Sequence, residues 1–157
     1  MKNSISVTIW QNNFLLTFVP TPIGNLEDVS TRSLKAIEKA EIILCEDTRV
    51  TKKLLHLLKE KYQFTTNFID CIALHSHNEE QFISTLDTNY FDKNIIYMSD
   101  AGMPAVSDPG AKLVEYALSN NIKYDVLPGA NALLTAYASS GFLDTPFLFF
   151  GFLPHKG

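Results

Sequence analysis

Four short segments carry the residue types that could bind a ligand or do chemistry, and each follows an apolar run. They are VPTPIGN at 19–25, EDTR at 46–49, HSHNEE at 75–80 and SDAGMPAVSDPG at 99–110. The last holds two glycines, two prolines, two aspartates and two serines. Its main-chain N–H and C=O groups could recognise an adenine edge or the two ends of an amino acid.

The charged segment allows two interpretations. Asp47 or Thr48 can cap a helix, with Glu46 and Arg49 as a surface ion pair of little energetic consequence. Alternatively, the acidic and basic side chains together bind a polar substrate at the end of a strand. VPTPIGN also allows two interpretations: it is a rigid turn, or it lets a ligand approach the backbone closely. Its sequence matches neither the GxGxxG motif nor a phosphate loop.

The histidine segment invites a metal hypothesis. Alternate residues of an extended segment share a face, so His75 and His77 could converge on an ion. Substrate contact, or a polar loop in which Asn78 caps the next helix ahead of Gln81, explains the same residues. We therefore predict no metal site here.

The elements that position these segments alternate between apolar strands and amphipathic helices. We expect strands at Phe14–Val19, Ile42–Cys45, within Phe68–Leu74, Ile95–Met98 and Tyr124–Leu127. This pattern predicts an α/β fold with a mostly parallel, doubly wound sheet of about five strands. Ligands bind outside the carboxyl ends of the strands in such sheets, where all four segments begin.

The helices are predicted from caps and apolar spacing. Ser30 caps a helix over Thr31–Ala40, and Asp108 caps a helix that has Pro109 at its first position. The inward faces are expected to be Val50, Leu54, Leu57 and Leu58 in one helix, and Leu113, Val114, Ala117 and Leu118 in another.

The last thirty residues suggest a second unit. Asn131 caps a short helix that Gly141 ends, and Phe147–Phe152 is a further apolar strand. We expect an unassigned extension at 1–13, an N-terminal α/β domain at 14–127, and a linker with the truncated start of a C-terminal α/β domain at 128–157.

Composition limits the possible partners. The chain has 157 residues, 46% of them apolar, and a net charge of -4. It therefore has no broad basic coat, and a nucleic-acid contact must be local, for example through Lys52, Lys53, Lys59 and Lys61. No apolar run is long enough to span a membrane and no signal peptide is evident, so a cytoplasmic location is expected.

Taken in order, VPTPIGN, CEDTR, HSHNE, SDAGMPAVSDPG, PGANALL and GFLP resemble the tetrapyrrole methylase superfamily over about residues 14 to 157. Within it, the chain is similar to the ribosomal RNA small-subunit methyltransferase I branch. The resemblance implies methyl transfer from S-adenosylmethionine to the ribose 2'-hydroxyl of a cytidine in 16S rRNA, within the small ribosomal subunit. It also implies a homodimer in the full-length protein, and a fragment that is nearly inactive by itself.

The resemblance also implies a set of binding residues. The cofactor would contact Pro22, Ala101, Gly102, Met103, Val106, Asn131 and Ala132. Relatives that act on tetrapyrroles carry Asp where this chain has Met103, and Asp100 is the candidate to compensate. The cofactor would lie in a cleft between two domains.

The chemistry leaves several catalytic candidates open. In-line methyl transfer needs alignment of the reacting atoms, exclusion of water and a group that accepts the hydroxyl proton. The candidates for that group are Glu46, Asp47, His75, His77 and Glu79, with Arg49 as a phosphate clamp. Two alternatives remain: a metal-dependent hydrolase that uses His75 and His77, and a non-catalytic nucleotide-binding module.

Overall fold

A five-stranded parallel sheet forms the centre of the protein. The computed structural model describes residues 16–66, 68–142 and 145–152. The strands are β1 (Leu16–Phe18), β2 (Ile42–Cys45), β3 (Asp70–Ala73), β4 (Ile95–Met98) and β5 (Tyr124–Val126), in the order β3-β2-β4-β1-β5. Every pairing is parallel. The predicted fold class is confirmed. All five predicted strands are present, as far as the structure describes their residues.

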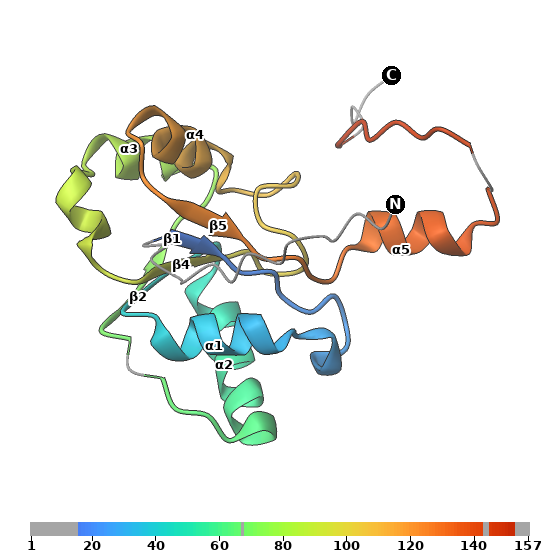
Figure 1. Cartoon of the computed structure of the whole chain (residues 1–157), viewed down its shortest axis with the longest axis horizontal. Helices are drawn as coiled ribbons and strands as arrows, with labels where there is room; N and C mark the ends of the chain where they lie inside the picture. The colour runs from blue at the N-terminus through green and yellow to red at the C-terminus, as the bar shows by residue number, and fades with distance from the viewer. Residues whose placement is uncertain (1–15, 67, 143–144, 153–157) are drawn as a thin grey trace, which may run out of the picture.

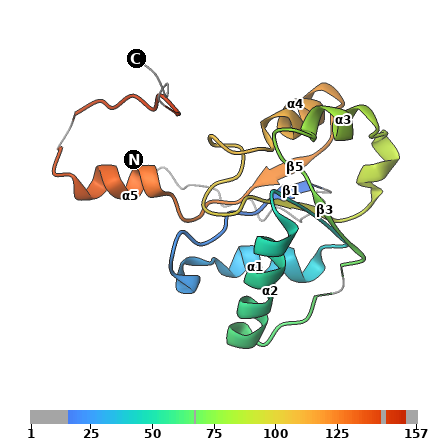
Figure 2. The same cartoon turned by 180° about the vertical axis from the view of Figure 1, so that it is seen from behind.

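Helices cover both faces of this sheet (Figure 1, Figure 2). One face carries α1 (Thr31–Lys39) and α2 (Thr48–Tyr62), and the other carries α3 (Glu79–Ser84) and α4 (Ala111–Ser119). Short 3-10 turns occupy Leu26–Asp28 and Thr88–Asp92. The helices after β1 and β2 therefore lie opposite to those after β3 and β4.

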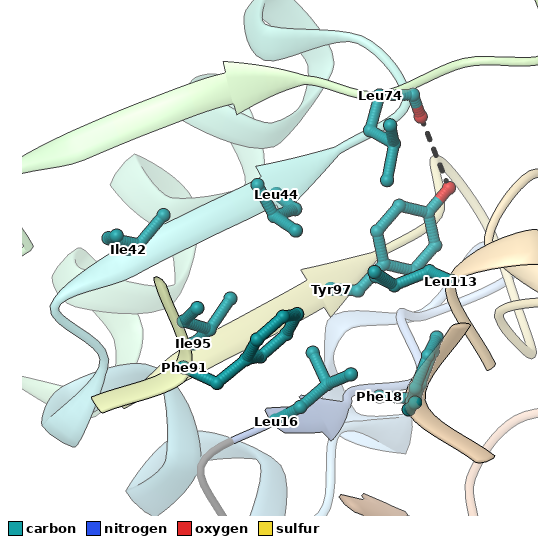
Figure 3. Packing of buried hydrophobic residues seen from close by; sticks show 10 residues of the cluster. Leu16, Phe18, Ile42, Leu44, Leu74, Phe91, Ile95, Tyr97 and Leu113 are labelled. Carbon is teal, nitrogen blue, oxygen red and sulfur yellow. Dashed lines mark hydrogen bonds between the residues drawn. The ribbon is translucent and has the colours of Figure 1, made fainter. Parts of the chain in front are cut away.

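Alternation along the strands divides the core into two layers. Leu44, Tyr97 and Phe18 point toward α3 and α4, whereas Ile43, Cys45 and Ile96 point toward α1 and α2. Figure 3 shows the first layer, in which the Tyr97 hydroxyl donates a hydrogen bond to the Leu74 carbonyl at 3.4 Å. Because central strands are buried on both faces, their residues are almost all apolar, which is why they were predictable.

The buried face of α2 differs from the predicted one. Leu58 is buried as predicted and Leu54 packs partly buried against the core, but Thr51 and Leu55 are buried in place of Val50, which is 40% exposed, and of Leu57, which also faces solvent. The prediction failed because four leucines within five positions fit two adjacent faces, and the buried Thr51 is polar and gives no apolar signal for the observed one.

The start of α4 also differs. The helix begins at Ala111 with Gly110 as its N-cap, so neither Asp108 nor Pro109 takes its predicted position. Leu113 and Ala117 are buried as expected, but Leu118 is exposed. The reason is that Ala105, Ser107 and Gly110 all have positive φ, which keeps the chain irregular for two residues longer.

The C-terminal part extends away from the sheet. Asn131 caps α5 (Ala132–Ser139) as predicted, with its side chain accepting from the Leu134 amide at 2.9 Å. The described residues 145–152 form no strand, contrary to the prediction for Phe147–Phe152, because no strand lies beside them to supply hydrogen bonds. The predicted extension at 1–13 lies outside the described residues. None of the described helices is long and apolar enough to cross a bilayer.

Candidate functional site

The site forms around the carboxyl end of β4. This strand lies between β2 and β1, and the helices that follow those two neighbours cover the face opposite to α4. The connections from β4 and from its two neighbours therefore run to opposite faces of the sheet, and ligands bind at the strand ends of sheets with this arrangement. Three of the four segments predicted from the sequence, those that follow β1, β2 and β4, meet at this end of the sheet, where Thr21 bonds to Ser99 and Asp47 bonds to Asp100 (Figure 1).

The loop of residues 99–110 is tied to the loop after β1. Thr21 and Gly102 form an antiparallel bridge, with amide-to-carbonyl distances of 3.0 and 3.1 Å. The buried Thr21 hydroxyl also donates to the Ser99 carbonyl at 3.2 Å. VPTPIGN is therefore more than a rigid turn, because it fixes the position of the loop after β4.

The loop is held in an unusual conformation. Ala105 and Ser107 are in the left-handed region, with φ of 63° and 58°, beside Gly102 at 86°. Each left-handed residue other than glycine costs about 1–2 kcal/mol. Such strain persists only where the surroundings fix the backbone, and it is concentrated at ligand sites.

A pocket of about 280 Å³ lies between this loop and the start of α5. It brings together six of the predicted cofactor residues from two separate segments: Ala101, Gly102, Met103, Val106, Asn131 and Ala132. At Gly102 a Cβ would lie 3.3 Å from the Ile23 side chain, so a larger residue would crowd this wall. A mostly apolar pocket with a few polar side chains, here Ser107, Asp108 and Asn131, can hold a nucleoside-like ligand.

Two predicted cofactor residues are not among the described residues of the pocket wall. Ile23 lines the pocket where Pro22 was expected, and Asp100 lies on the other side of its loop. Sequence reasoning missed Ile23, Ser107, Asp108 and Leu133, and it did not place Phe149, Gly151 and Phe152 at the pocket. Ile23, Leu133, Phe149 and Phe152 are apolar and carry no chemical signal, and Asp108 was assigned to a helix cap, so only the folded chain identifies these residues.

Glu46 and Asp100 form the centre of a carboxylate cluster beside the loop. Glu46 Oε2 accepts from the Asp100 amide at 3.3 Å, and Asp100 Oδ1 accepts from the Asp47 amide at 3.2 Å. Burial raises the pKa of both the Glu46 and the Asp100 carboxyl groups. A carboxylate with a raised pKa is a stronger base than one in water.

Asp47 and Arg49 bind mainly each other. Asp47 caps α2 by accepting from the Arg49 amide at 2.8 Å, and the Arg49 guanidinium lies 2.6 Å from its carboxylate. These hydrogen bonds lower the pKa of Asp47 to about 2. Arg49 remains exposed. Asp47 is therefore the helix cap, as predicted, but the described ion pair joins Arg49 to Asp47 and not to Glu46 as expected, because the Glu46 carboxylate is turned to the Asp100 amide. Asp47 is a poor base.

The histidines lie at the far end of the cluster. The His75 and His77 rings are 5.9 Å apart between centroids and meet edge to face, and His77 is exposed. Within the described residues, no group of three or more His, Cys, Asp or Glu residues could hold a metal. Asn78 precedes α3, but its side chain does not cap the helix; it accepts from the His75 amide and donates to the Ala73 carbonyl, both at 2.8 Å.

Glu79 is separated from the other candidates. Its side chain is 4% exposed, and Oε1 accepts from the Gly110 amide at 2.9 Å. It is not among the described residues that line the pocket. The structure therefore brings Glu46 and Asp47 together with Asp100, and leaves Glu79 behind the loop.

Comparisons with known proteins find the family that the sequence motifs resemble. The family described as Tetrapyrrole (Corrin/Porphyrin) Methylases matches residues 15–145. A curated relative from Helicobacter pylori strain J99, named "Ribosomal RNA small subunit methyltransferase I", is 53% identical over 90% of this chain and 52% of its own length. Proteins of the same name from Campylobacter fetus and Bacillus subtilis are 52% and 43% identical, over 91% and 88% of this chain and 53% and 46% of their own lengths. The chain thus spans about half the length of these relatives.

Solved structures agree on the fold. The native form of uroporphyrin III C-methyl transferase from Thermus thermophilus superposes with a TM-score of 0.56 at 16% identity, over 78% of this chain and 51% of that one. At this identity the likeness concerns the fold alone. The family match covers most of the chain and includes the strand-end loops described above, so the chain belongs to the tetrapyrrole (corrin/porphyrin) methylase family.

Proposed function

We propose that this chain is the cofactor-binding part of an enzyme that transfers a methyl group from S-adenosylmethionine to a ribose 2'-hydroxyl of a cytidine in 16S rRNA. The observation that carries the proposal is the pocket at the end of β4, where the loop and the start of α5 meet. The names and sequence identities of the relatives support the rRNA substrate.

The residues of the pocket fit the cofactor in charge and in shape. Among its described lining residues, Asp108 is the only charged side chain, so no cation there would repel a sulfonium. Gly102 has no side chain, and its N–H and C=O groups are both bonded to Thr21, so it would form a fixed wall against which the ligand packs. We propose that Ala101, Gly102 and Met103 hold the methionine portion, with Val106 packing nearby and Asn131 and Ala132 on the opposite wall.

When bound, S-adenosylmethionine would supply the methyl group as an electrophile. The chain would hold the acceptor ribose in line, exclude water and take the hydroxyl proton. We assign the proton to Glu46 or its neighbour Asp100, because burial raises the pKa of both. His75 lies close enough to Glu46 that a positive charge on the imidazole would lower the Glu46 pKa.

The other candidates have less direct roles in this proposal. Asp47 orients Arg49, and the free edge of the guanidinium would contact an RNA phosphate. Pro22 would shape the turn next to Ile23. His77, being exposed, would contact substrate rather than carry the proton.

The proposal extends to the parts of the protein beyond the pocket. Residues 128–157 would begin a second domain that closes over the cofactor; the relatives are about twice as long as the part that they share with this chain. The full-length enzyme would act as a homodimer on the small ribosomal subunit, and therefore in the cytoplasm.

Cofactor binding is the direct test with this chain. Calorimetry should detect S-adenosylhomocysteine binding, and Ala101→Leu should weaken it about tenfold or more by filling the pocket. Ala111→Leu is the matched control, since Ala111 is exposed and is not among the described lining residues. No binding by the wild-type chain, or equal binding by A101L, would contradict the assignment.

The substrate is tested separately. Labelled cofactor and small ribosomal subunits are incubated with the longest form of the protein, and the RNA is digested to nucleosides. The expected product is 2'-O-methylcytidine, and Glu46→Gln should slow its formation at least tenfold. Label in a base, or in another nucleoside, would overturn the assignment of the cytidine ribose.

A further inference from the structure

Glu79 is a buried acidic residue whose described side-chain hydrogen bond goes to the loop of residues 99–110. It is the first residue of α3, yet its side chain is almost fully enclosed. Acidic residues are almost never fully buried unless a partner satisfies them. Here the partner is the main-chain amide of Gly110, at 2.9 Å from Oε1.

Gly110 itself is tightly confined. It is the N-cap of α4, with φ of 109°, and a Cβ built on it would lie 2.8 Å from the Tyr97 ring. Tyr97 is fully buried and is bonded in turn to the carbonyl of Leu74. Glu79 thus holds the end of the loop against the sheet, from the side of α3.

The opposite end of the loop has its own anchor. Thr21 bridges Gly102 through both main-chain hydrogen bonds. Between the two anchors lie Ala105 and Ser107, both in the left-handed region. A strained segment relaxes when one end is released, so the pocket wall depends on both anchors.

We propose that Glu79 is a positioning residue that fixes the loop of residues 99–110 for ligand binding, and that it takes no part in proton transfer. Its effect on the cofactor rests on the function proposed above. The neighbouring Glu80 provides a contrast, because it also links α3 to α4, through an exposed ion pair with Lys112. Exposed pairs contribute little, so α3 and α4 can lose that link without loosening the loop.

The test compares three substitutions in this chain. Glu79→Gln keeps the size of the side chain and an oxygen that can accept the hydrogen bond. Glu79→Met keeps the volume but has no comparable acceptor. Glu80→Met is the control at an exposed position. Amide hydrogen exchange is followed at Gly110 and Gly102, with Ile43 and Ile96 in the sheet as a check on the fold. S-adenosylhomocysteine affinity is measured by calorimetry.

We expect E79M to speed exchange at Gly110 about tenfold or more while the sheet amides stay protected, and to weaken binding by a similar factor. E79Q and E80M should stay within about threefold of the wild-type protein in both measurements. Unchanged exchange at Gly110 in E79M would overturn the proposal. An E79Q variant that loses methyl transfer while it keeps loop protection and cofactor affinity would also overturn it, by assigning Glu79 to the chemistry.

The two proposals can fail independently. If the wild-type chain does not bind S-adenosylhomocysteine, the proposed function fails for this chain. The exchange at Gly110 still decides whether Glu79 holds the loop, because that measurement needs no ligand.

Discussion

Among the individual residues, three carboxylates that look alike in the sequence have different environments in the structure. Asp47 accepts hydrogen bonds from the Arg49 guanidinium, and these lower the pKa of Asp47. Burial instead raises the pKa of Glu46 and of Asp100. The three pKa values differ because the side chains have different partners. Asp47 is the N-cap of α2, whereas Glu46 accepts a hydrogen bond from the Asp100 amide. Glu46 and Asp100 are therefore better proton acceptors than Asp47.

The raised pKa of Glu46 has a consequence for stability. Its ordinary value is 4.5, so above that pH and up to the raised pKa the folded state binds more protons than the unfolded state. Stability contributed by this group is therefore lost as the pH rises through that window. Glu46→Gln removes the titrating carboxyl group, so E46Q should gain stability over the wild-type protein as the pH rises above 4.5.

Urea unfolding at several pH values measures this difference. Glu38→Gln, which removes an exposed carboxylate from α1, controls for the loss of one negative charge. A difference between E46Q and the wild-type protein that shrinks with rising pH would contradict the raised pKa.

At the scale of elements, the structure resolves an ambiguity in α2. The sequence LLHLL at 54–58 allows two apolar faces, and the helix buries Leu55 and Leu58 with Thr51. The Asp47 cap fixes where the helix starts, but the sheet beneath it fixes its rotation. Ile43, Cys45 and Met98 supply the surface against which this face packs.

Paired truncations in α2 test the observed face. Leu55→Ala should lower the unfolding free energy by about 2–5 kcal/mol, because Leu55 is buried in the layer beneath α1 and α2. Val50→Ala should change it by less than about 0.5 kcal/mol, since Val50 is exposed. Urea denaturation gives both values, and a larger loss in V50A than in L55A would restore the face predicted from spacing.

At the scale of the whole molecule, apolar side chains collect outside the sheet domain. Leu148 is 83% exposed and Phe150 is 68% exposed, and Phe142 and Phe152 are also exposed. In both views α5 extends from the side on which the strands end (Figure 1, Figure 2). Large exposed apolar surfaces mark sites of association, in agreement with the proposed second domain.

Replacing two of these side chains separates association from folding. The double variant L148S/F150S should show less light scattering than the wild-type chain at high concentration, because apolar contact surface is lost. Its urea midpoint should stay close to that of the wild-type chain, since neither residue belongs to the sheet core. A large drop in that midpoint would place the segment within the folding unit of the sheet.

The sequence by itself determined the sheet and the places where chemistry gathers. Buried parallel strands are continuous apolar runs, and the polar loops that follow them lie at one edge, so Ile42–Cys45, Ile95–Met98 and the loop of residues 99–110 were all predictable. The order of six motifs also predicted the family, which the match over residues 15–145 confirms.

Only the tertiary structure decided which residues of those loops meet. The Thr21 bridge to Gly102 and the bond from the Gly110 amide to Glu79 join positions 81 and 31 residues apart. Strand order and the left-handed turns of the loop set these contacts. Such contacts have no local sequence signature, because the same residue types serve equally well as helix caps, turns and surface ion pairs until the packed sheet selects among them.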